Sequence, residues 1–85
     1  MAEDCFISSR IMVVADGATE GSPEVFVLAL TNGQIWQVHP DNVGIARKGP
    51  GGAAKEGHYI QICRHWGSLR MKVRNTGSSF VVFQK

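Results

Sequence analysis

The chain has 85 residues, of which 44% are apolar, and a formal net charge of +2. This length allows one domain with one modest hydrophobic core, and no apolar run approaches the ~18 residues of a membrane-spanning helix. We therefore expect a single small domain over residues 1–85 with no membrane partner. The acidic N-terminus has no secretory signal ahead of it, which predicts a cytoplasmic protein.

Charged residues are distributed unevenly along the chain. Residues 1–42 contain one base, Arg10, and six acids, whereas residues 43–85 contain eight bases and one acid, Glu56. Such an asymmetry is typical of a protein with an anion-binding face. It is equally consistent with two halves that attract each other within one barrel.

An N-terminal strand and a loop are predicted first. Residues 5–14 are rich in Ile, Val and Phe, which favours a strand. Residues 15–23 contain two glycines, a proline and small polar residues, so they have little to bury and predict a flexible loop.

Residues 24–38 contain two apolar runs around Asn32 and Gly33, the pattern of a β-hairpin with a two-residue type I′ turn. In that register the strands pair as Leu30 with Ile35, Ala29 with Trp36, Leu28 with Gln37 and Val27 with Val38. Both faces are then largely apolar, which suits a small barrel or a sheet covered by a partner. We expect the large indole of Trp36 to lie in the core.

The middle of the chain is the least regular. Pro40 lacks an N–H group, so strand pairing ends near it. Residues 43–46 predict a short turn or one brief strand, and the glycines of residues 47–57 predict a flexible loop. That loop does not fit a phosphate-binding loop, because Lys55 is followed by Glu56 and no helix pattern follows.

Three strands, at residues 59–64, 68–74 and 79–83, complete the chain, with turns between them. The second of these alternates strictly, with Leu69, Met71 and Val73 on one side and Arg70, Lys72 and Arg74 on the other. This period of two predicts one buried face and one solvated, basic face. Five or six short antiparallel strands and no convincing helix predict an all-β fold, a small barrel of SH3-like or OB-like type.

The sequence has no motif for catalysis or for metal or cofactor binding. Cys5 and Cys63 stand alone, whereas metal motifs use paired thiols, so we expect two free thiols in a reducing cytosol. The histidines lack zinc-site spacing; they are His39, His58 and His65. No serine or cysteine sits in a nucleophile motif. We therefore expect a non-enzymatic protein with no catalytic, metal-binding or cofactor-binding residues.

The basic strand is the main candidate for a binding site. Small barrels hold single-stranded nucleic acid on basic strands that have aromatic neighbours. The candidate nucleic-acid or partner-binding residues are Tyr59, Arg64, Trp66, Arg70, Lys72 and Arg74. The alternative interpretation is an ordinary solvated strand face, whose long side chains cover apolar surface and oppose the acidic half.

A protein-interaction or assembly module is the alternative function. The two-sided apolar hairpin at residues 24–38 and the apolar final strand at residues 79–83 favour it, because an uncovered strand edge pairs readily with another chain. The chain would then form homo-oligomers, or bind a foreign protein as a component encoded by a phage or mobile element.

The segment around Asn32 resembles part of a group of small, uncharacterised bacterial β proteins, which carry a segment of the form L-x-N-G-Q-x-W-x-Q followed by a Gly-Ser turn and a basic alternating strand. The matching residues are Leu30, Asn32, Gly33, Gln34, Trp36, Gly67, Ser68 and the strand through Arg74. This chain departs from the pattern at Val38, where the group has Gln. The resemblance spans residues 10–83 and implies a small β-barrel and no known reaction.

Overall fold

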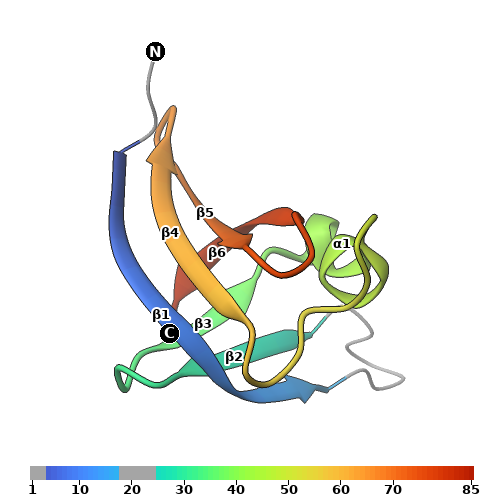
Figure 1. Ribbon diagram of the computed structural model, residues 1–85. Helices are drawn as coiled ribbons and strands as arrows, with labels where there is room; N and C mark the ends of the chain where they lie inside the picture. Colours follow the sequence, from blue (N-terminus) through green and yellow to red (C-terminus); the bar gives the residue numbers. More distant parts are fainter. Residues whose placement is uncertain (1–3, 18–24) are drawn as a thin grey trace.

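The computed structural model describes residues 4–17 and 25–85, which form a closed antiparallel β-barrel (Figure 1). The elements are β1 (Asp4–Asp16), β2 (Phe26–Leu30), β3 (Ile35–Val38), the 3-10 helix η1 (Pro40–Asn42), α1 (Val43–Lys48), β4 (Tyr59–His65), β5 (Ser68–Val73) and β6 (Ser79–Gln84). The strands follow one another around the barrel as β1, β2, β3, β6, β5 and β4. The prediction of a small all-β barrel is thus confirmed.

β1 closes the barrel because it pairs with two neighbours. Its first half, up to Arg10, pairs with β4, and its second half, from Ile11, pairs with β2. The register shifts between Ile11 and Val13, and such a bulge bends a strand; Figure 1 shows β1 curving around the barrel. The bulge also exchanges the two faces, so that Val13 is exposed while Val14 packs against the core.

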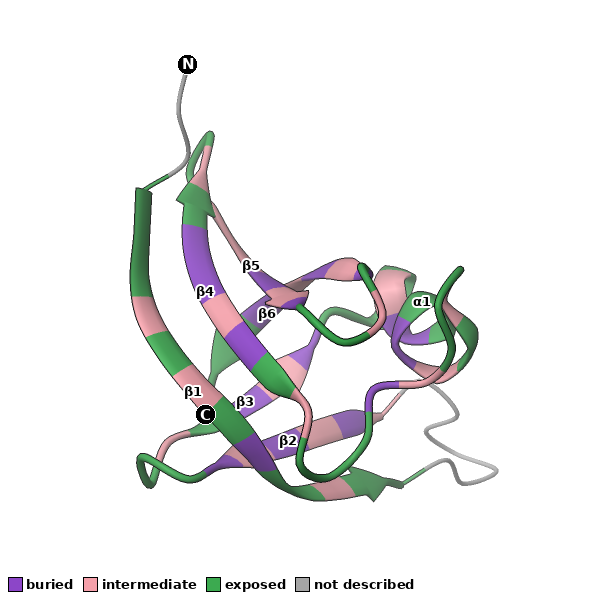
Figure 2. Cartoon of the chain, viewed as in Figure 1, coloured by how far each residue is buried: buried purple, intermediate pink, exposed green. Residues whose placement is uncertain are grey.

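Alternate residues of the strands fill the barrel interior, which Figure 2 shows as alternating buried and less buried bands along β2, β4 and β5. The core residues are Ile11, Phe26, Leu28, Leu30, Trp36, Val38, Val43, Ala46, Ala54, Ile60, Ile62, Met71, Val73, Phe80 and Val82. Trp36 is only 2% exposed, as predicted. Its burial fixes the orientation of the hairpin that contains it.

That hairpin has a different turn from the one predicted. The backbone N–H of Leu30 donates to the carbonyl of Gln34 (2.9 Å), and that of Gly33 donates to the carbonyl of Leu30 (3.0 Å). Among the described residues of this loop only Gly33 has a positive φ, of 90°, as in a type I turn followed by a glycine bulge. The two-residue type I′ prediction is therefore wrong.

The consequence is a register shifted by one residue. Ala29 lies opposite Ile35, and Leu28 lies opposite Trp36. Trp36 therefore shares the buried face with Leu28 rather than the outer face with Ala29, and Ile35 is exposed. The physical reason is burial, because the shifted register places the large indole inside the barrel.

Residues 43–46, expected as a turn or brief strand, belong to a short helix. Pro40 begins η1 at a position where its missing N–H costs nothing, and His39 Nδ1 accepts a hydrogen bond from the Asp41 N–H (3.1 Å). α1 follows directly, and its residues Val43 and Ala46 are buried in the core. This spacing of three places both on one helix face, so tertiary burial stabilises a helix too short to stand alone.

The glycine-rich segment after α1 packs closely on the turn between β5 and β6. A Cβ atom at Gly49 would meet the side chain of Ser78, and one at Gly51 would overlap the backbone of Thr76. The Ala54 N–H donates to the Ala46 carbonyl (2.9 Å). The glycines are therefore needed for close backbone approach. Of the other predicted loop, at 15–23, most residues lie outside the described part of the chain.

The two cysteines form a disulfide, Cys5–Cys63, so the prediction of two free thiols is wrong. The pairing of β1 with β4 places Cys5 directly opposite Cys63. Because 58 positions separate them in the sequence, their spacing gave no sign of this contact. The bond joins β1 and β4 beside the end of the barrel at which β4 turns into β5.

Candidate functional site

The candidate site lies on the outer face of β1, β4 and β5. On β4 the residues Ile60 and Ile62 point into the core, and on β5 the residues Met71 and Val73 do so. The intervening residues therefore face outward. The predicted alternation of β5 between a buried face and a basic face is confirmed; Arg70 and Lys72 are half-buried and Arg74 is exposed.

The strand register aligns outward-facing side chains in rows across the three strands. Arg10 lies opposite Tyr59, and the Arg74 N–H donates to the Tyr59 carbonyl (2.9 Å). Arg10, Tyr59 and Arg74 therefore form one row, which we call the Arg–Tyr–Arg row. The neighbouring rows are Ser8, Gln61 and Lys72, then Cys5, Cys63 and Arg70.

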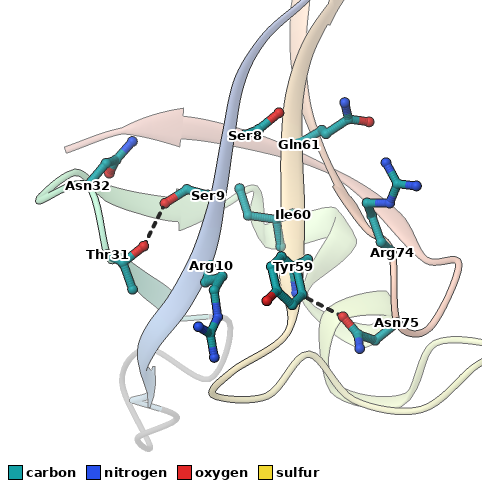
Figure 3. Close-up of a pocket in the computed structure, with 10 residues that line it drawn as sticks. All are labelled: Ser8, Ser9, Arg10, Thr31, Asn32, Tyr59, Ile60, Gln61, Arg74 and Asn75. Carbon is teal, nitrogen blue, oxygen red and sulfur yellow. Dashed lines mark hydrogen bonds between the residues drawn. The ribbon is translucent and has the colours of Figure 1, made fainter.

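A surface pocket of about 690 Å³ surrounds the Arg–Tyr–Arg row (Figure 3). β1, β4, the loop between β2 and β3, and the turn after β5 all contribute to its wall. The lining residues are Ser8, Ser9, Arg10, Thr31, Asn32, Tyr59, Ile60, Gln61, Arg74 and Asn75. This described lining contains two arginines and no carboxylate, so the pocket favours anions.

Hydrogen bonds hold the pocket wall in place. The hydroxyl groups of Ser9 and Thr31 lie 3.1 Å apart and join β1 to the loop between β2 and β3. The Tyr59 N–H donates to Asn75 Oδ1 (2.8 Å), which joins β4 to the turn after β5. Figure 3 shows both contacts. Groups from distant parts of the sequence are thereby fixed around one space.

Tyr59 stands at the centre of the pocket and is 53% exposed. The Arg10 guanidinium carbon lies 5.0 Å from the centre of its ring, within the range of a cation–π contact. The ring therefore offers apolar surface next to a cation. A planar group with a nearby negative charge fits such a place.

The predicted site residues do not all come together. Tyr59 and Arg74 lie in the pocket, whereas Arg64 and Trp66 lie at the opposite end of the β4–β5 hairpin, with Arg70 and Lys72 between the two ends. Arg64 lies 5.3 Å from the centre of the Phe6 ring and 3.8 Å from a carboxylate oxygen of Asp4. The pocket and the hairpin tip are thus two separate places, and Arg64 lies on the side of β4 opposite to Tyr59 because it alternates in phase with the core residues Ile60 and Ile62.

The prediction from sequence missed Arg10 and most of the polar residues of the pocket wall. Arg10 is the single base in the first 42 residues, and this was the one feature of the sequence that set Arg10 apart from its neighbours. Its position beside Tyr59 depends on the pairing of β1 with β4. Long-range pairing of this kind leaves no local pattern in the sequence.

No cluster of three or more His, Cys, Asp or Glu residues that could hold a metal ion occurs within residues 4–17 and 25–85. The two helices of these same ranges are too short and too polar to cross a lipid bilayer.

The fold of this protein is assigned from its own structure rather than from a relative. No protein-family model matches the chain, and no curated protein or solved structure is significantly similar to it. Residues 4–17 and 25–85 form a small, closed, six-stranded antiparallel β-barrel with one short α-helix.

Proposed function

We propose that the chain is a non-enzymatic binding module that holds nucleic acid on the outer face of β1, β4 and β5. The observation that supports this most is the Arg–Tyr–Arg row inside a pocket whose described lining carries no carboxylate. Arginine binds phosphate through a fork of N–H donors. An exposed tyrosine ring stacks on bases. The row combines both kinds of contact.

The surrounding polar groups suit the same ligand. Ser8, Gln61 and Asn75 line the pocket, and their hydroxyl and amide groups can bind phosphate, sugar or base edges. This proposal involves no reaction, metal or cofactor, because the site has a recognition surface without a nucleophile and base in contact.

Fluorescence anisotropy with labelled DNA and RNA oligonucleotides, single-stranded and duplex, tests the proposal. We expect affinity to fall as salt rises, because bound Lys and Arg release counterions from phosphate. Arg10→Ala and Arg74→Ala should each weaken binding and lower the salt slope by roughly 0.7–0.9 for each phosphate that the variant no longer neutralises. Lys48→Ala, an exposed residue of α1, removes the same charge away from the site and serves as control. Absence of binding at low salt would refute the proposal.

A second candidate function is self-assembly through the opposite outer face. Val13, Ala29 and Ile35 lie in one row across β1, β2 and β3, and Val27, Gln37 and Phe83 lie in the next across β2, β3 and β6. The large side chains at Val13, Ile35 and Phe83 are exposed. The Lys85 N–H donates to the Ile35 carbonyl (3.0 Å), so Lys85 borders the first row. The other residues of the two rows, the apolar outer face, are uncharged, and a second copy of the chain could cover them in a symmetric contact.

The oligomeric state tests this second candidate. Light scattering after size-exclusion chromatography should give a dimer whose fraction rises with concentration, and Ile35→Lys should shift it to monomer. Ile45→Lys, at an exposed residue of α1, is the matched control. A monomer at every concentration would exclude self-assembly through this face.

The cytoplasmic location predicted from the sequence remains a proposal, and the Cys5–Cys63 disulfide argues against it, because the cytosol keeps most thiols reduced. Blocking free thiols with an alkylating agent in cells lysed directly into denaturant decides the question, because Cys63 is buried and the folded protein would shield it even when reduced. Full alkylation of both cysteines would support a cytoplasmic protein, and no alkylation would place the chain in an oxidising compartment.

A further inference from the structure

We propose that the ligand is a single strand of nucleic acid that runs along the β4–β5 hairpin from Tyr59 to Trp66. This inference rests on the proposed function and extends the site from a pocket to a path. Two exposed aromatic rings mark its ends. Tyr59 is 53% exposed in the pocket, and Trp66 is 81% exposed at the hairpin tip.

The backbone at Trp66 is the first reason to assign it a contact outside the chain. Its φ of 53° lies in the left-handed region, as does the φ of 82° at Gly67. With His65 opposite Ser68, this is a type I′ turn, in which Asn or Gly normally takes the place of Trp66. Trp66 gains little from burial, since its described ring contact is an edge-on one with the neighbouring His65 at 6.1 Å, and strain of this kind concentrates at binding sites.

The surface between the two rings is the second reason. Arg70 lies opposite Cys63 and Lys72 lies opposite Gln61 on the outward side of the hairpin, so cationic side chains lie along the interval from Tyr59 to the tip. Near the tip, the Asp4 carboxylate faces the Arg64 guanidinium at 3.8 Å, and Arg64 lies on the side of β4 opposite to this interval. The path therefore offers cations for a backbone and rings for bases.

The geometry favours a single strand over a duplex. β4 has seven residues, and at about 3.3 Å per residue it is ~20 Å long. Stacked nucleotides rise about 3.4 Å each, so a strand of roughly six nucleotides spans it, and fewer suffice when the strand is extended. The rings at both ends can stack on unpaired bases. A single strand presents such bases, whereas a duplex keeps its bases within the helix stack.

The experiment compares oligonucleotides of about three and about twelve thymidines, of which only the longer can reach both rings. Two measurements are made on the disulfide-bonded protein: anisotropy, and quenching of tryptophan fluorescence by acrylamide. Because Trp36 is buried and Trp66 is exposed, acrylamide reports on Trp66. The test variant is Trp66→Asn, since Asn tolerates the left-handed conformation; Tyr59→Ala tests the pocket, and Ile45→Gln is the control.

We expect the longer oligonucleotide to protect Trp66 from acrylamide and the shorter one to leave it accessible. Trp66→Asn should weaken binding of the longer oligonucleotide about tenfold, in line with the loss of one stacked base, and leave the shorter one unaffected. Tyr59→Ala should weaken both. Ile45→Gln should weaken neither.

Other outcomes separate this inference from the proposed function. Binding of the longer oligonucleotide with Trp66 still accessible, and with equal affinity for Trp66→Asn, overturns the path and leaves the pocket proposal standing. Equal affinity for a duplex of the same length overturns the single-strand assignment. Failure of both oligonucleotides to bind at low salt overturns the proposed function together with this inference.

Discussion

The indole Nε1 of Trp36 donates a hydrogen bond of 3.2 Å to Oε1 of Gln34, which satisfies the polar group of a buried ring. The same oxygen accepts from Asn32 Nδ2 (3.1 Å), and the Gln34 N–H donates to Asn32 Oδ1 (3.0 Å). The segment from Asn32 to Trp36 therefore forms a hydrogen-bonded unit that fixes the turn and the indole together. Gln34 and Trp36 therefore serve the fold, while Asn32 also lines the pocket.

Replacing Gln34 should consequently lower stability. Gln34→Leu leaves the Trp36 N–H without its partner, and we expect the free energy of unfolding to fall by about 1–3 kcal/mol. Urea denaturation measures this change. Oligonucleotide affinity of the folded variant should match the wild type, and a selective loss of affinity would instead place Gln34 in the binding site.

Relief of the left-handed backbone at Trp66 should raise stability. Trp66→Asn removes a bulky residue from a φ of 53°, and we expect a gain of about 1 kcal/mol in the free energy of unfolding. The companion variant Gly67→Ala, at a φ of 82°, should lose a similar amount. An unchanged or lower stability for Trp66→Asn would mean that the indole contributes to folding.

The disulfide should be a major contributor to stability. It closes a loop with a sequence separation of 58, and the chain-entropy model assigns about 4 kcal/mol to a loop of that size. Thermal unfolding with and without a reductant, followed by mass spectrometry of alkylated thiols, tests this. The double variant Cys5→Ser/Cys63→Ala should have the same thermal stability as the reduced protein, and a reductant should not change that stability.

Two glycines should respond in opposite directions to replacement by alanine. A Cβ atom at Gly51 would overlap the Thr76 backbone, so Gly51→Ala should cost roughly 1–3 kcal/mol through forced displacement. Gly44 lies within α1 with open space around its Cβ position, so Gly44→Ala should add about 0.5–1 kcal/mol. Urea midpoints of the two variants give the comparison, and a tolerated Gly51→Ala would contradict the close packing of this loop.

Local patterns in the sequence were sufficient to predict the three strands of the C-terminal half of the barrel. The alternation around Met71 predicted both faces of β5, and the burial of Trp36 was predicted from its size. The Asn32–Gly33 pair predicted a turn but not its type, because Asn tolerates both the positive φ of a type I′ turn and the negative φ that it has here, and Gly33 fits either turn. The choice between registers depended on which face of the hairpin met the core.

The candidate site was harder to predict because it is built from distant segments. The sequence indicated the cations of β5 and the ring of Tyr59. It gave no indication that Arg10 lies beside that ring, or that Cys5 lies opposite Cys63, since both facts follow from the pairing of β1 with β4. The helix at Val43 was missed for a related reason, because burial against the barrel stabilises it more than its own propensity does.

The strand order has a further consequence for how the chain folds during synthesis. β1 cannot complete its pairing until β4 has been synthesised. β3 cannot complete its pairing until β6, the last strand in the described chain, has been synthesised. Until the C-terminal strand has left the ribosome, the β2–β3 hairpin has an open apolar edge that can pair with other nascent chains. Slow translation or a premature stop ahead of β6 would therefore leave an aggregation-prone fragment with no native partner for β3.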